Sequence, residues 1–164
     1  KGRGEEWQLG QARLGNSGSR PPMSCEFGLV TGSSSGMGRA CAQALLKEGA
    51  TVIGIDISTH PVGGDNDPSF YELAADVTDA DALRSAVDAG VQRFGGIDMV
   101  VAAAGVFGAY DHIADLDQGD WDDTLAVNFN GETNLLQATH PFLRLAPGGG
   151  RVLLVGSTNV SALG

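Results

Sequence analysis

The sequence has little positive charge, few cysteines and no long apolar run. Its 10 lysines and arginines are outnumbered by 20 aspartates and glutamates, which gives a net charge of −10. Nucleic acid is therefore not an expected partner, because affinity for phosphate backbones comes chiefly from clustered Lys and Arg. Cys25 and Cys41 are too few for a disulfide framework and lie in no metal-binding pattern, which favours a reducing cytoplasm. The longest apolar stretch, residues 99–109, is too short to cross a membrane, and the N-terminus lacks the apolar core of a signal peptide.

Length and composition favour one compact domain with an extension before it. A chain of 164 residues with 42% hydrophobic residues is large enough to bury a core. Residues 1–22 are rich in Gly, Ser, Arg and Gln, show no apolar periodicity and end in two prolines, so we expect a disordered extension there. The predicted folded unit covers residues 23–164.

From residue 27 onward, short apolar runs alternate with stretches of helical spacing. The apolar runs predict five strands, at residues 27–31, 51–56, 69–75, 99–103 and 151–156. The helical spacing predicts three helices, at residues 37–48, 80–94 and 120–146. Thr78 is the expected N-cap of the second helix, and the Gly- and Pro-rich residues 57–68 predict a loop in place of a further crossover helix. This alternation predicts an α/β fold with a doubly wound parallel sheet in the strand order 3-2-1-4-5.

The first predicted strand leads into Thr-Gly-Ser-Ser-Ser-Gly-Met-Gly at residues 31–38. Its glycines permit a tight turn and let backbone N–H groups approach a diphosphate at the N-terminus of the following helix. A dinucleotide is the expected ligand, and a glycine-rich turn that only joins a strand to a helix is the alternative. Asp56 favours the dinucleotide, because a carboxylate at the end of the second strand can bind both ribose hydroxyls of an adenosine and repel a 2′-phosphate. Asp76 ends the third predicted strand.

The spacing Thr-Gly-x-x-x-Gly-x-Gly resembles that of the short-chain dehydrogenase/reductase family, and the resemblance continues to the last residue. It implies a Rossmann-type fold, truncated after the fifth strand, with NAD as the cofactor. NADP users in the family carry a basic residue at the place of Ser35 or Ile57, whereas Arg39 is expected to be a surface residue of the helix. The residues that the resemblance places at the cofactor are Thr31, Gly32, Ser34, Ser35, Gly36, Met37, Gly38, Asp56, Asp76, Val77, Ala103, Ala104 and Gly105.

The resemblance also implies two catalytic residues. Asn128 matches the family asparagine that holds a water in a proton relay, and Ser157 matches the serine that hydrogen-bonds the substrate oxygen. Such a donor suits hydride transfer, in which charge develops on oxygen. Purely structural roles, in a helix irregularity and in a turn respectively, are the alternatives. Ala102 and Ala103 depart from the family pattern, because they replace two asparagines that brace the centre of the sheet, and they predict a less rigid strand end.

The acid/base pair of the family, Tyr-x-x-x-Lys, is absent from the sequence. Tyr71 and Tyr110 are followed four residues later by alanine, and the only lysines are Lys1 and Lys47. The lysine of this pair lowers the pKa of the tyrosine toward the operating pH, as general acid/base catalysis requires. Structural or surface positions are expected for the histidines, which are His60, His112 and His140.

Two functions are therefore expected. One is the N-terminal, cofactor-binding part of an NAD-dependent oxidoreductase for a small alcohol or carbonyl substrate. Residues 135–143 and 149–160 look most like the dehydrogenase half of bifunctional rhamnulose-phosphate aldolase/lactaldehyde dehydrogenases, which implies a hydroxyaldehyde or sugar-derived substrate. The other is a non-catalytic dinucleotide-binding fragment, which the missing acid/base favours for this chain. An open apolar edge at the last predicted strand is expected to cause aggregation or formation of a homo-oligomer.

Overall fold

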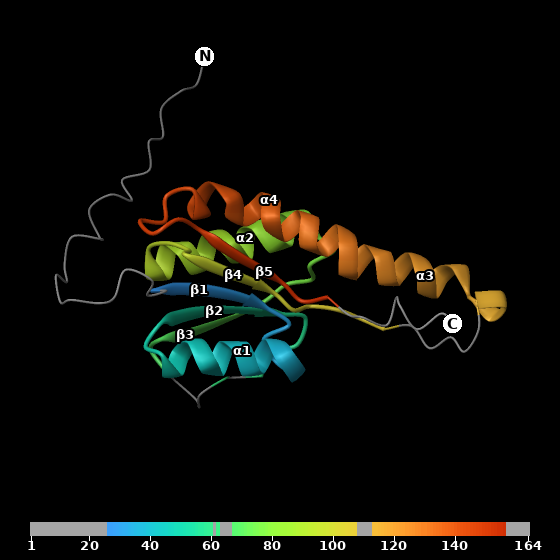
Figure 1. The fold of residues 1–164 in the computed structure, drawn as a ribbon, viewed down its shortest axis with the longest axis horizontal. Coiled ribbons are helices and arrows are strands. Elements are labelled where there is room, and N and C mark those ends of the chain that lie inside the picture. The colour runs from blue at the N-terminus through green and yellow to red at the C-terminus, as the bar shows by residue number, and fades with distance from the viewer. Residues whose placement is uncertain (1–25, 61, 63–66, 108–112, 157–164) are drawn as a thin grey trace, which may run out of the picture.

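The computed structural model describes residues 26–60, 62, 67–107 and 113–156. Five parallel strands form one sheet in the order β3-β2-β1-β4-β5 (Figure 1), which confirms the predicted fold class and strand order. The strands are β1 (Phe27–Thr31), β2 (Thr51–Asp56), β3 (Phe70–Ala74), β4 (Met99–Ala102) and β5 (Arg151–Leu154). The predicted extension at residues 1–22 lies outside the described residues.

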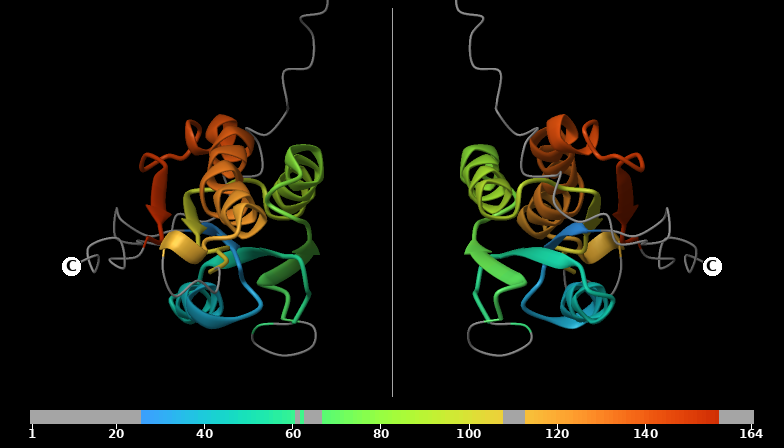
Figure 2. Two further views of the ribbon diagram at one scale, coloured as in Figure 1. Left: turned by 90° about the vertical axis from the view of Figure 1, so that its right-hand side faces the viewer. Right: turned by 90° about the vertical axis from the view of Figure 1, so that its left-hand side faces the viewer.

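Helices lie on both faces of the sheet (Figure 2). α1 (Gly36–Lys47) covers one face, while α2 (Ala80–Phe94) and α4 (Glu132–Leu143) pack side by side on the other. The short 3-10 helix η1 spans Ile113–Asp115. No helix in the described part of the chain is both long enough and apolar enough to span a bilayer.

Alternate side chains of the strands fill two apolar layers, one on each face of the sheet. The layer against α2 and α4 includes Leu29, Ile53 and Val100 together with Leu83 and Leu135 from the helices. The layer against α1 includes Val30, Val52, Val101 and Ala42. Because both faces of the central strands are buried, their sequences are continuous apolar runs rather than alternating ones.

The connection from β2 to β3 contains no helix among its described residues, in agreement with the predicted loop. Val62 is fully buried there and belongs to the layer against α1, together with Val52 and Phe70. Gly54 on β2 makes room for the Phe70 ring, since a Cβ at position 54 would lie 2.6 Å from that ring. A buried loop side chain thus covers part of the sheet face that lies beside α1.

The predicted N-cap of α2 is wrong. The cap is Asp79, whose carboxylate accepts hydrogen bonds from the backbone N–H groups of Asp81 and Ala82 at 3.1 and 3.0 Å. Thr78 instead donates its backbone N–H and its hydroxyl to Oδ1 of Asp76, each at 2.8 Å. The carboxylate is the better cap because its charge also interacts favourably with the helix dipole.

The third predicted helix starts and ends earlier in the chain than predicted. α3 (Gln118–Leu125) begins two residues before the predicted start, because the Asp117 carboxylate accepts hydrogen bonds from the N–H groups of Gly119 and Asp120. The helical run ends with α4 at Leu143 rather than at residue 146, where backbone hydrogen bonds of the turn type take over.

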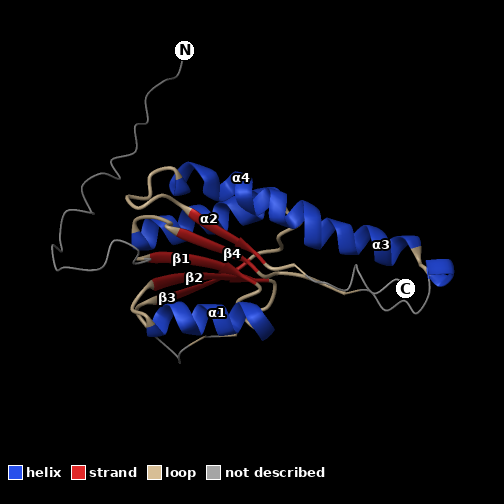
Figure 3. Ribbon diagram, viewed as in Figure 1, coloured by secondary structure: helices blue, strands red, loops and turns tan. Residues whose placement is uncertain are grey.

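A π-helix, η2 (Ala126–Gly131), connects α3 to α4 in one continuous helical run (Figure 3). Such turns are rare and are frequently found at functional sites. Gly131 is buried where the helix meets the chain after β3, and a Cβ there would lie 2.6 Å from Cγ2 of Val77. The π-helix therefore packs close to the carboxyl end of the sheet, and it carries Asn128.

The outer edge of β5 is apolar and has no neighbouring strand within the described part of the chain, where β5 is the last strand in the sheet order (Figure 2). Val152, Leu153 and Leu154 are 44%, 51% and 46% exposed, whereas Val101, the register partner of Leu153 on β4, is 2% exposed. Open edges of this kind pair with other chains.

We expect the chain to self-associate at tens of micromolar through β5, and we expect Leu153→Lys to shift it toward the monomer, because a charge on an edge strand opposes pairing. Sedimentation velocity measures both. Leu145→Lys, at a position that is 62% exposed after α4, is the matched control and should leave association unchanged. A monodisperse wild-type monomer would contradict the prediction.

Candidate functional site

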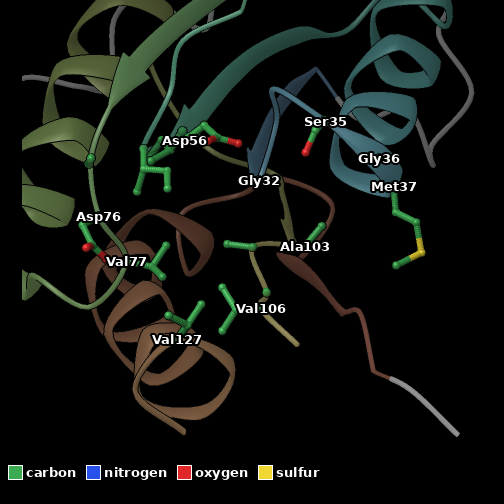
Figure 4. A pocket seen from close by; sticks show the side chains of 15 residues that line it. Gly32, Ser35, Gly36, Met37, Asp56, Asp76, Val77, Ala103, Val106 and Val127 are labelled. Atoms are coloured by element: carbon green, nitrogen blue, oxygen red, sulfur yellow. The ribbon is translucent and has the colours of Figure 1, made fainter. Parts of the chain in front are cut away.

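A cavity of about 390 Å³ opens at the carboxyl ends of β1, β2 and β4 (Figure 4). The chain builds the sheet from β1 through β2 to β3 and then returns to place β4 on the other side of β1. Open α/β sheets bind ligands outside such a switch point. The cavity is lined by Gly32, Ser35, Gly36, Met37, Ile55, Asp56, Ile57, Ala75, Asp76, Val77, Ala103, Ala104, Gly105, Val106 and Val127.

The glycines of the loop after β1 bring three backbone segments together. Gly32 has φ +67°, and a Cβ there would lie 2.8 Å from the carbonyl oxygen of Ala103. A Cβ at Gly38 would overlap the carbonyl oxygen of Gly32 and lie 2.6 Å from its carbon. Gly36, with φ +50°, has nothing within 4 Å of its Cβ position apart from its chain neighbours, so the space beside its backbone is open.

The N-terminus of α1 lies at this cavity and suits an anion. Its N-cap, Ser35, makes no side-chain hydrogen bond to the first turn. The first N–H groups of the helix are therefore left for another acceptor, and the helix dipole adds partial positive charge. Together with the open space at Gly36, this arrangement fits the diphosphate of a dinucleotide.

Asp56 presents a carboxylate at the end of β2. Its Oδ2 accepts a hydrogen bond from the N–H of Ser34 at 3.1 Å, and its Oδ1 accepts one from the N–H of Ser58 at 3.0 Å. Each carboxylate oxygen has a second lone pair, so the oriented group can also accept ribose hydroxyls. None of the described residues that line the cavity is basic. Burial raises the pKa of Glu132, whose carboxyl lies on α4 outside this lining.

Two side chains hold the chain at the end of β4. The hydroxyl oxygen of Thr31 accepts hydrogen bonds from the N–H groups of Ala103 and Ala104 at 3.2 and 3.3 Å. The amide of Asn128 both donates to the carbonyl and accepts from the N–H of Val106, each at 2.8 Å. The chain after β4 is thus held by side chains from β1 and from the π-helix.

The structure brings most of the predicted cofactor residues to the cavity. Ten of the thirteen line it, while Thr31, Ser34 and Gly38 lie behind the lining and support the loop. Arg39 is half-buried rather than fully on the surface, and its guanidinium donates to the carbonyl of Ser34 at 3.3 Å. Ser157 lies outside the described residues, as do Tyr110 and His112. His60 and His140 are exposed.

Apolar side chains form the part of the lining that the sequence patterns did not predict. These residues are Ile55, Ile57, Ala75, Val106 and Val127. Figure 4 shows Val77, Val106 and Val127 converging on the cavity from three separate segments. Ile55 and Ala75 lie next to Asp56 and Asp76 in the sequence. These two residues could therefore have been predicted, because each is adjacent to an aspartate at the end of a strand.

The family profile described as short chain dehydrogenase matches residues 27–162. The chain belongs to the short-chain dehydrogenase/reductase family. It is 35% identical over 136 residues to D-threitol dehydrogenase of Mycolicibacterium smegmatis, a match that covers 79% of this chain and 51% of that protein. The chain spans about half the length of the curated relatives that it matches.

Solved structures of the family have the same fold. A 3-ketoacyl-ACP reductase from Sinorhizobium meliloti is 38% identical, with a TM-score of 0.68 over 77% of this chain and 51% of that one. Carveol dehydrogenase from Mycobacterium avium, solved in complex with NAD, is 27% identical, with a TM-score of 0.69 over 80% of this chain and 54% of that one. The family membership and the Rossmann-type fold agree with the resemblance found in the glycine motif.

We expect Gly38→Ala to lower the free energy of unfolding by about 1–3 kcal/mol and to abolish binding of nicotinamide dinucleotides, because the added Cβ pushes α1 away from the loop. Urea denaturation and calorimetric titration measure the two effects. The control is Ala44→Gly on the exposed side of α1, which should cost about 0.5–1 kcal/mol and leave binding intact. Wild-type binding by Gly38→Ala would show that the close packing is not needed.

Proposed function

We propose that the chain is the cofactor-binding part of an NAD-dependent oxidoreductase that transfers hydride between nicotinamide and a small alcohol or carbonyl compound. The observation that carries this proposal is Asp56, oriented at both carboxylate oxygens at the rim of a cavity whose described lining has no basic residue. A 2′-phosphate would there meet a fixed negative charge without a cation beside it. NAD has a hydroxyl at that position, which the carboxylate can accept.

Each element of the cavity has a separate task in this proposal. The N-terminus of α1 and the backbone around Gly36 hold the diphosphate, and Asp56 holds the adenosine ribose. Asp76 and Val77 contact adenine, while Ala103, Ala104 and Gly105 allow the cofactor to approach the end of β4. Bound nicotinamide supplies the hydride acceptor or donor.

The catalytic groups of the proposal are Ser157 and Asn128. The Ser157 hydroxyl donates a hydrogen bond to the substrate oxygen, where negative charge develops. The Asn128 amide uses one donor and one acceptor site on Val106, so its remaining sites are available to position a water. D-threitol and carveol, named in two relatives, support a hydroxyl-bearing substrate. The finer resemblance to lactaldehyde dehydrogenases stays a prediction.

The second candidate is a non-catalytic dinucleotide-binding chain. The observation that favours it is the absence of Tyr-x-x-x-Lys from the sequence, with Tyr71 and Tyr110 each followed by alanine at the lysine position. Tyr71 also lies away from the cavity: its ring packs edge-on against Phe94 and under the guanidinium of Arg93. The two candidates share the same cofactor site and differ only in turnover.

If Asp56 selects the cofactor, the chain binds NAD at least about ten-fold more tightly than NADP, because like charges about 4 Å apart near a protein surface repel by a few kcal/mol. Calorimetric titration with both dinucleotides measures the ratio. Asp56→Ala should reduce the ratio of NAD affinity to NADP affinity. The control is Asp88→Ala on α2, which makes the same change of charge outside the cavity lining and should leave this ratio unchanged. Equal or tighter binding of NADP by the wild-type chain would refute the role of Asp56.

The chain alone should show no dehydrogenase turnover, since loss of a positioned acid/base costs about 10² to 10⁴ in rate. The assay follows nicotinamide absorbance with a panel of small alcohols and hydroxyaldehydes that includes D-threitol, and the D-threitol dehydrogenase of Mycolicibacterium smegmatis is the positive control. Turnover on the order of 1 s⁻¹ would mean that another group of this chain acts as the acid/base.

A further inference from the structure

All the polar atoms of Ser34 are engaged, although Ser34 does not line the cavity. Its N–H donates to Oδ2 of Asp56 at 3.1 Å, and its carbonyl accepts from Arg39 at 3.3 Å. Its hydroxyl lies between the carbonyl oxygen of Ser58 and Oε1 of Glu72, 3.1 Å from the latter. Ser34 is 8% exposed, so water does not readily replace these partners. Through these bonds, Ser34 connects the glycine-rich loop to the end of β2 and to β3.

Glu72 is the residue of β3 that reaches Ser34. Its Oε1 accepts the N–H of His60 at 2.7 Å in addition to the hydroxyl of Ser34. The register partner of Glu72 on β2 is Gly54, where a Cβ would lie 2.7 Å from the hydroxyl oxygen of Ser33. The missing side chain at Gly54 thus lets the glycine-rich loop settle over β2, within reach of a side chain from β3.

The groups that Glu72 holds are the groups that orient Asp56. The two oxygens of the Asp56 carboxylate accept the N–H groups of Ser34 and Ser58, one on each side. Glu72 binds the first of these residues directly and binds His60, two residues after the second. Removing the Glu72 carboxylate takes away one of the two acceptors of the Ser34 hydroxyl, which keeps the carbonyl oxygen of Ser58, and it takes away the acceptor of the His60 N–H. Each lost bond lies next to one of the two N–H groups that orient the Asp56 carboxylate.

We propose that Glu72 is a positioning residue that acts through Ser34 and the turn after β2 to aim the Asp56 carboxylate at the adenosine ribose, and so sets the preference for NAD over NADP. This inference rests on the proposed function. Glu72 is not among the residues that line the cavity, so its effect on the cofactor is indirect. A glutamate that only stabilised the fold would change stability and leave the ratio of the two affinities unchanged.

The experiment measures dissociation constants of NAD and NADP by calorimetric titration for the wild-type chain and four variants. We expect Glu72→Ala and Ser34→Ala each to weaken NAD binding about ten-fold, the order of one hydrogen bond to a charged group, and to reduce the preference for NAD. Glu72→Gln keeps an oxygen acceptor and should restore NAD affinity to within about three-fold of wild type. Ser33→Ala is the matched control, because its hydroxyl is equally buried and has no hydrogen-bond partner among the described residues.

A double-mutant cycle with Asp56→Ala tests whether Glu72 acts through Asp56. In the Asp56→Ala background, Glu72→Ala should leave the ratio of NAD to NADP affinity unchanged, since the carboxylate that it positions is gone. An equal effect of Glu72→Ala on the ratio with and without Asp56 would overturn the proposal. So would a wild-type ratio in both Glu72→Ala and Ser34→Ala.

The outcomes separate this inference from the proposed function. Failure of the wild-type chain to bind either dinucleotide overturns both, whereas NAD preference that depends on Asp56 and not on Glu72 overturns this inference alone. Circular dichroism checks that each variant is folded. If Glu72→Ala does not fold, a wild-type ratio of NAD to NADP affinity in Ser34→Ala overturns the proposal, because that variant lacks the hydrogen bond between Ser34 and Glu72.

Discussion

The site depends on the close backbone contact between Gly38 at the start of α1 and Gly32 at the end of β1. With no side chain at either residue, the first turn of α1 lies against the carbonyl group of Gly32, and Gly32 in turn lies against Ala103 after β4. One strand end, one helix start and a second strand end therefore meet at backbone distance. The cavity and the N-terminus of α1, which has no side-chain cap, lie beside this contact.

Hydrogen bonds from side chains then fix the strand ends around that contact. Thr31 holds the chain after β4 by two N–H groups, and Asn128 holds it two residues later by a matched pair of bonds. The sequence predicted a less rigid strand end, because Ala103 and its neighbour lack amide side chains. The hydrogen bonds at this strand end come from Thr31 on β1 and from Asn128 on the π-helix, and the lower rigidity stays a prediction.

The sheet and the glycine-rich loop could be predicted from local sequence, because each depends on a short pattern. Continuous apolar runs such as β2 identify buried parallel strands, and the glycine spacing identifies the turn before α1. The errors occur where two local choices compete: Thr78 and Asp79 are both good caps, and the charge of Asp79 decides the outcome. The sequence indicated a helix irregularity at Asn128 only as an alternative, and the π-helix η2 lies there; its close approach to Val77, 54 residues before Gly131, could not be read from local sequence.

Glu72 was not predicted for the same reason. Its sequence position, inside β3 and without a neighbouring motif, reveals nothing about the loop 38 residues earlier, and only the parallel pairing of β2 with β3 brings the two together. The cavity thus has two parts of different construction. At the end of β2, Asp56 is held on both sides by bonds within the described chain, so its carboxylate is oriented without a ligand. At the other end, the wall is made of Val106 and Val127 on segments that Asn128 ties together, and no described lining residue there is an acid or a base. In the proposed function, the choice between NAD and NADP therefore depends on the part of the cavity at Asp56, and it requires no acid or base in the part at Val106 and Val127.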